Sequence, residues 1–184
     1  MLQPSNTHFL PPFPDAVVVN EGQSADYPIV RGKTYRFRII SYAAFASAMI
    51  HFDSAHNMTV IMNDASYINP INVNALRVAP AQRYDVLIRV VEDNRNHPFL
   101  ISLDVNRDYT NAASDPPVAW AQNYTGYLVL DPSQPKPATS VAVWAPADDA
   151  LFEPLDHSLV ALPEADNTVI LDFQFCTDKF GIPR

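Results

Sequence analysis

The chain has 184 residues, of which 48% are hydrophobic and 17% are charged, and its net charge is −8. This composition excludes an intrinsically disordered chain and is sufficient for one domain with a sizeable core. The acidic balance, with no run of basic residues, argues against nucleic acid as a partner. No apolar run is long enough to cross a membrane. We also expect no signal peptide, since residues 1–14 lack a cationic start and a long apolar stretch.

The first third of the chain predicts a linker followed by short strands. Residues 1–14 are rich in proline and irregular, and are interpreted as an incoming linker. Apolar residues then predict strands at 15–20 and 25–30, with turn residues between them. Over 34–41, aromatic and aliphatic residues alternate with arginines, which is the period-of-two pattern of a half-buried strand.

The middle of the chain continues this pattern without any helical period. Residues 43–48 are small and apolar, and fit either a connecting loop or a helical turn. Strands are predicted at 58–62, 73–78, 83–91, 99–105 and 125–131. Short strands at such spacing predict an all-β fold, a Greek-key β-sandwich or barrel, over residues 15–131.

The last third predicts a connector and then the edge of another domain. Residues 132–167 contain many prolines and form no periodic pattern, so they are interpreted as a Pro-rich connector laid over the domain surface. Residues 168–175 alternate again and predict one more strand. We therefore expect residues 168–184 to begin a following domain.

The histidines do not predict a copper or zinc site. Such sites use several His or Cys ligands at short spacing, often as a His-x-His pair, and the chain contains no such pair. His51 and His56 are five positions apart, and an odd offset would place them on opposite faces of a strand. The single cysteine, Cys176, has no histidine beside it and is interpreted as an ordinary thiol or as one that pairs outside this segment.

Two further groups of residues could carry function. Asp148 and Asp149 form a tight acidic pair, which either solvates a loop or holds a cation such as Fe(II), because carboxylate oxygens suit that ion. Asn57 and Asn123 each begin an N-glycosylation sequon, although two sequons in a chain of this length are close to chance.

Five segments, in the same order, resemble the second cupredoxin domain of fungal multicopper oxidases, the laccases and ferroxidases. They are PDAVVVN at 14–20, GKTYRFRII at 32–40, HNMTVI at 56–61, AQRYDVL at 81–87 and TGYLV at 125–129, which resemble that domain's PDxxLIN, GKTYRxRIIN, HxMTVI and AQRYxVL segments and its last strand. The resemblance covers nearly the whole chain and implies a plastocyanin-like cupredoxin fold.

Within this family, AAFAS at 43–47 resembles the GAFAS segment of cell-surface iron oxidases, which hold Fe(II) with acidic residues. The resemblance implies Asp53 or Ser54, together with Asp148 or Asp149, as candidate substrate-binding residues. The family usually has an acid two residues before the histidine, where this chain has Ser54. A relative that oxidises phenols or pigments therefore fits as well as an iron oxidase.

The resemblance also implies how the chain is used. In three-domain multicopper oxidases the coppers lie in domains one and three, and the middle domain acts as a spacer and a substrate-side surface. The parent enzyme would be extracellular or on the cell surface, with O2 and a small reducing substrate as its reactants. The alternative is a cupredoxin-like binding or interaction module without redox chemistry, and motifs outside this segment would decide between them.

Overall fold

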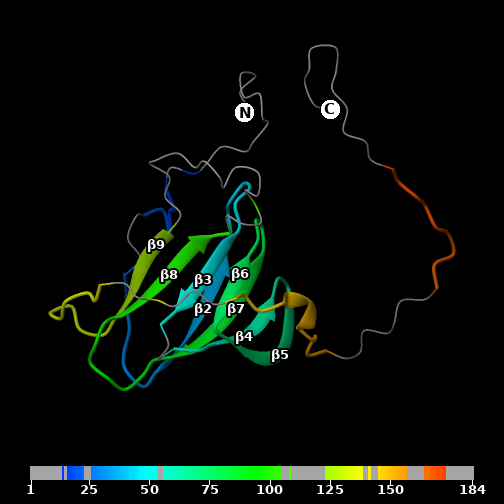
Figure 1. The fold of residues 1–184 in the computed structure, drawn as a ribbon. Helices are drawn as coiled ribbons and strands as arrows, with labels where there is room; N and C mark the ends of the chain where they lie inside the picture. Colours follow the sequence, from blue (N-terminus) through cyan, green and yellow to red (C-terminus); the bar gives the residue numbers. More distant parts are fainter. Residues whose placement is uncertain are drawn as a thin grey trace, which may run out of the picture.

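The computed structural model (Figure 1) forms nine strands and one short 3-10 helix in the part of the chain that it describes. That part comprises residues 14, 16–22, 26–53, 56–104, 108, 123–138, 141, 145–156 and 164–172. The strands are β1 Asp26–Pro28, β2 Thr34–Ile40, β3 Ala48–Phe52, β4 Met58–Asn63, β5 Ser66–Val73, β6 Ala75–Val78, β7 Arg83–Arg89, β8 His97–Leu103 and β9 Asn123–Val129.

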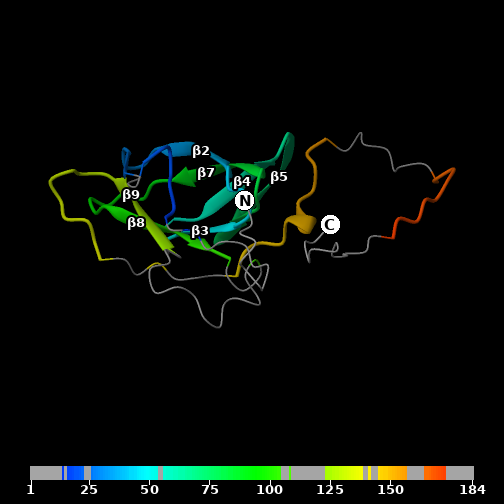
Figure 2. The same cartoon turned by 90° about the horizontal axis from the view of Figure 1, so that it is seen from above.

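The strands form two sheets that pack face to face, as the view from above shows (Figure 2). The five-stranded sheet has the order β1-β9-β8-β3-β6 and the four-stranded sheet has the order β2-β7-β4-β5. Strand β1 pairs in parallel with β9, whereas β2 with β7 and β3 with β8 are antiparallel. Strands that are neighbours in a sheet but distant in sequence require the chain to cross between the sheets. The two packed sheets confirm the predicted all-β sandwich.

The core lies between the two sheets and follows from the alternation in the sequence. Along β2, intermediate and exposed residues alternate without interruption, and β7 places buried Tyr84, Val86 and Ile88 opposite Ile39, Phe37 and Tyr35. The other sheet contributes buried residues such as Phe52, Phe99 and Leu128. Burial of such side chains contributes roughly 1.5–3 kcal/mol each, which makes this core the main source of stability.

Several predicted strands have different limits in the structure. The strand predicted at 15–20 is wrong in its described part, because only Val19 forms a bridge, with Gly22. The strand predicted at 73–78 is in fact two elements, since β5 ends at Val73 and β6 begins at Ala75 in the other sheet. Residues 43–47 form a loop rather than a helical turn.

Two strands were not predicted at all. Strand β3 follows the small apolar loop directly, and its histidine interrupts the expected apolar pattern. Strand β5 contains Pro70, which cannot donate a ladder hydrogen bond, and it is tolerated because β5 lies at the edge of its sheet. Both strands pack normally despite these unfavourable local signals.

The described part of the connector lies against the domain. Ala147 N–H donates to Ala75 O at 3.1 Å, and Leu155 N–H donates to Tyr67 O at 2.8 Å. Between them residues Asp149–Leu151 form the 3-10 helix, the only helical element longer than a single residue in the described chain. No helix in that part is long and apolar enough to span a bilayer.

The final predicted strand shows no pairing where it is described. Residues 164–172 are exposed and belong to neither of the two sheets. Residues 173–175 of that predicted strand, and Cys176, lie outside the described residues, as do His8 and His157.

Candidate functional site

The acidic pair in the connector is used for local structure. The Asp148 carboxylate accepts a hydrogen bond from Ala150 N–H at 3.1 Å and caps the 3-10 helix. Asp149 Oδ2 accepts from Gln82 Nε2 at 3.0 Å and from the Tyr84 hydroxyl at 3.2 Å. These contacts hold the connector at the Tyr84 end of strand β7.

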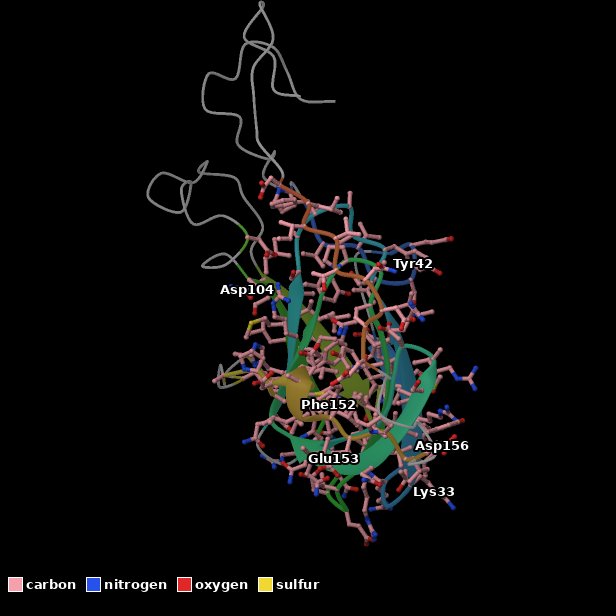
Figure 3. All side chains as sticks on the ribbon, turned by 90° about the vertical axis from the view of Figure 1, so that its right-hand side faces the viewer. Lys33, Tyr42, Asp104, Phe152, Glu153 and Asp156 are labelled. Carbon is pink, nitrogen blue, oxygen red and sulfur yellow. The ribbon has the colours of Figure 1, made fainter. Side chains whose placement is uncertain are left out.

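Tyr84 is the buried anchor of this contact. Its side chain is 1% exposed, and its ring meets that of Phe152 edge to face, with ring centroids 6.2 Å apart. Figure 3 looks onto this region, with Phe152 and Glu153 labelled beside the short helix. Burial, followed by the charge of Asp149, raises the pKa of the Tyr84 phenol well above its ordinary value of 10.0, so it remains a neutral donor.

A second group of candidate residues converges at the other end of the sandwich. Asp53 Oδ1 lies 2.6 Å from His56 Nδ1, and Asp53 Oδ2 lies 2.5 Å from His97 Nδ1. The two imidazole rings meet edge to face with centroids 4.6 Å apart. We call Asp53, His56 and His97 the histidine–aspartate cluster. Ser54, which was predicted as the alternative to Asp53, lies outside the described residues.

The fold brings this cluster together from three places in the chain. Asp53 follows the end of β3, His56 comes shortly before β4, and His97 is the first residue of β8. His56 N–H also donates to Asp53 O at 3.0 Å, which closes the loop between β3 and β4. Register in the five-stranded sheet pairs Phe52 with Phe99, so Asp53 must emerge near the start of β8.

Further polar groups surround the cluster. His97 Nε2 lies 2.8 Å from Asp93 Oδ1, so the imidazole lies between two carboxylates. Val91 N–H donates to His56 Nε2 at 3.5 Å. Burial alone would raise the pKa of Asp53, but the hydrogen bonds and charge of His56 and His97 hold it below its ordinary value. The carboxylate is therefore ionised at neutral pH.

His51 does not belong to this cluster. It lies within β3 with 0% exposure, and its Nε2 is 3.4 Å from Ser102 Oγ. Among the described residues, Asp53, His56 and His97 are the only group of three or more whose ligand atoms lie closely enough to hold a metal ion, and His51 is not part of it. Sequence reasoning missed His97 because it lies 41 positions after His56, and no local pattern links the two residues.

The two acidic candidates are far apart. Asp149 bonds to Tyr84 near the start of β7, whereas the cluster reaches Val91, just past the end of that strand. Seven residues of extended chain rise about 23 Å. The structure therefore does not bring Asp53 and Asp149 together within this chain.

Both glycosylation candidates are accessible. Asn57 directly precedes β4, and Asn123 is the first residue of β9, and each is exposed. Both positions can therefore accept a glycan without disturbing the core.

Comparisons with known proteins place the chain in a family. The multicopper oxidase family model matches residues 2–126. The iron transport multicopper oxidase fetC of Epichloe festucae is 33% identical over 165 residues, which is 88% of this chain and 25% of that protein. Laccase-4 of Thanatephorus cucumeris is 30% identical over 143 residues, which is 72% of this chain and 27% of that protein.

Solved structures agree on the fold. The crystal structure of Fet3p, described as a multicopper oxidase that functions in iron import, matches 99% of this chain with a TM-score of 0.85 and 22% identity. The match covers 34% of the Fet3p chain. The laccase of Botrytis aclada matches 66% of this chain with a TM-score of 0.54. The chain spans about a quarter of the length of the curated relatives that it matches, and it belongs to the multicopper oxidase family.

Proposed function

We propose that residues 15–131 are the middle cupredoxin domain of a longer multicopper oxidase. The parent enzyme would couple one-electron oxidation of Fe(II), or of a phenolic or pigment substrate, to reduction of O2 to water. Residues 132–167 would then connect this domain to a third cupredoxin domain beginning at 168–184. The near-complete match to Fet3p, over about a third of that protein, supports this placement within a larger chain.

The metal-ligating residues available in this segment support the proposal that it holds no copper. A blue-copper site needs a thiolate with two imidazoles, and the sequence has no cysteine beside a histidine and no His-x-His pair. Among described residues, the one group with metal-ligand geometry contains two imidazoles and a carboxylate, but no sulfur. These residues do not fit the family's copper centres, so we assign no electron-transfer step to this domain.

The remaining role is to space the flanking domains and to contribute to the surface on the substrate side. The loop between β2 and β3 carries Tyr42, which is 90% exposed, and Phe45, which is 47% exposed (Figure 3 labels Tyr42). These residues border an open apolar hollow of about 1070 Å³ that reaches down to Phe52 and Phe99. Apolar surface of this extent favours cover by a neighbouring domain.

The names of the relatives support two substrate classes. Proteins named for iron transport and a laccase both match this chain. Asp148 and Asp149 are the exposed acidic residues that could bind Fe(II). Asp53 is not near them, because its cluster lies beside the opposite end of β7. The accessible sequons at Asn57 and Asn123 are consistent with a secreted or cell-surface enzyme.

The test uses the full-length parent oxidase. Asp148→Ala with Asp149→Ala should raise KM for Fe(II) and leave phenol oxidation unchanged if this loop holds iron. Glu153→Ala is the matched control, because Glu153 also lies in the connector and contacts Asn69 at 3.3 Å. Unchanged Fe(II) kinetics in the double variant would exclude iron binding by the pair.

Copper content tests the placement of the domain separately. The purified 184-residue chain should contain no copper and show no oxidase activity, whereas the full-length parent should contain copper and be active. Stoichiometric copper with a blue absorption band in the isolated chain would overturn the proposal. A full-length protein without copper would instead indicate a redox-inactive binding module.

A further inference from the structure

We propose that the histidine–aspartate cluster, Asp53, His56 and His97, is a binding site for a divalent transition-metal ion of the zinc class. This site is separate from the family's copper chemistry and from the acidic pair in the connector. The proposal therefore does not depend on the function proposed for the parent enzyme.

The geometry of the ligand atoms supports a single ion. One carboxylate oxygen of Asp53 and one ring nitrogen of each histidine lie within 4.8 Å of one another, and Nδ1 of each histidine is in hydrogen-bond contact with Asp53. Two imidazoles and one carboxylate form a common three-ligand set for zinc, with the fourth position open to water. The side chains of His56 and His97 are 0% and 3% exposed, whereas that of Asp53 is 18% exposed, so the carboxylate side is where water or an ion can enter.

The surrounding groups orient the ligands. Asp93 accepts from His97 Nε2–H at 2.8 Å, and this directs Nδ1 of His97 into the cluster. Such a carboxylate behind a ligating imidazole is usual at zinc sites and strengthens the imidazole as a ligand. Asp93 is itself held by Arg95, at 3.0 Å from its other carboxylate oxygen.

Binding requires small changes that the structure permits. An ion with bonds of about 2.0–2.2 Å places its ligand atoms about 3.3 Å apart. The Asp53–imidazole contacts of 2.6 and 2.5 Å must therefore lengthen by less than about 1 Å, and any wider pair within the 4.8 Å group must close. Binding through Nδ1 requires both imidazoles to present that atom without a hydrogen. His56 then carries its hydrogen on Nε2 and loses the contact from Val91 N–H, which at 3.5 Å is at the limit of a hydrogen bond.

Zinc binding should be measured on the full 184-residue chain, stripped of metal with a chelator and then dialysed. Titration calorimetry with Zn²⁺ should give a single site, and Co²⁺ should give the visible absorption of a four-coordinate nitrogen and oxygen site. Zn²⁺ should also raise the melting temperature, because an ion that binds only the folded state stabilises it. Absence of Zn²⁺ binding to the unmodified chain would overturn the proposal.

Variants separate this site from adventitious binding elsewhere. Asp53→Asn and His97→Gln should abolish the site, and Asp93→Asn should weaken Zn²⁺ binding by about 10-fold to 100-fold without removing a ligand. Two matched controls should bind Zn²⁺ as the unmodified chain does. They are His51→Gln, a buried histidine outside the cluster, and Asp104→Asn, an aspartate paired with Arg77.

The outcomes distinguish a metal site from a purely hydrogen-bonded cluster. If Zn²⁺ affinity is the same in Asp53→Asn, Asp93→Asn and the unmodified chain, the ion binds elsewhere and the proposal is wrong. If His97→Gln does not fold, Asp93→Asn still provides the decisive comparison, because it retains all three ligands. The Co²⁺ spectrum must then persist in Asp93→Asn at a higher metal concentration.

Discussion

Asn96 and Asp131 exchange two hydrogen bonds. The Asn96 side-chain amide donates to Asp131 O at 3.0 Å, and its carbonyl oxygen accepts from Asp131 N–H at 3.1 Å. The same side chain also donates to Gln134 O at 3.1 Å and accepts from Leu130 N–H at 2.9 Å. One buried residue therefore secures the chain where it leaves β9 and enters the Pro-rich connector.

Asn96→Ala should lower the free energy of unfolding by about 2–4 kcal/mol, since it leaves several backbone groups without partners. Urea denaturation of the purified chain measures this loss. Asn94→Ala is the matched control, because Asn94 is exposed and its side chain accepts a hydrogen bond from Arg31 at 2.7 Å. It should cost no more than about 0.5 kcal/mol. Equal losses in the two variants would show that the Asn96 contacts contribute little.

Tyr84 should make the protein sensitive to alkaline pH. Burial and Asp149 raise the pKa of its phenol in the folded state, whereas in the unfolded chain it titrates near 10. Above that pH the unfolded state binds fewer protons, so the free energy of unfolding falls as pH rises. The decline should approach about 1.4 kcal/mol per pH unit for this group.

Tyr84→Phe tests this dependence directly. Urea denaturation at pH 9, 10 and 11 should show a shallower alkaline decline in the variant than in the unmodified chain. Tyr42→Phe, at a residue 90% exposed, should leave the decline unchanged. A decline of the same steepness in Tyr84→Phe would assign the effect to other groups.

Asp149 and Asp148 should contribute unequally to stability although they are adjacent. Asp149→Ala removes the carboxylate oxygen that accepts hydrogen bonds from Gln82 and Tyr84, and should lower the free energy of unfolding by about 1 kcal/mol. Asp148→Ala removes only the exposed cap on Ala150, and should stay within about 0.5 kcal/mol. Limited proteolysis should cut the connector sooner in Asp149→Ala. Similar cutting rates in both variants would contradict an anchoring role for Asp149.

Local pattern was sufficient to predict the strands that face both the core and solvent. β2 and β7 alternate clearly because one face of each is buried against the other sheet, and the predicted limits differ from the observed ones by one or two residues. β3 and β5 escaped prediction because tertiary pairing stabilises them despite a histidine in one and Pro70 in the other. Local periodicity does not indicate which distant segments of the chain will pair as neighbouring strands.

The histidine–aspartate cluster shows the same limit for sites. Asp53 was predicted from a family resemblance, but its partners were not, because His56 and His97 meet only through the pairing of β3 with β8. The spacing rule assumed that His51 and His56 share one strand, but His56 lies in the loop between β3 and β4. It could not find a ligand that approaches from another strand.

Tyr42 tests whether the apolar loop between β2 and β3 is surface that another domain would cover. If it is, the isolated chain should self-associate through it, since exposed aromatic patches favour association. Tyr42→Ser should shift sedimentation velocity toward the monomer, and should change the free energy of unfolding by less than about 0.5 kcal/mol. Tyr67→Ser is the control, because Tyr67 is 51% exposed but lies on β5, where it contacts Arg36. Self-association that falls equally in both variants, or in neither, would show that this loop is not the contact surface.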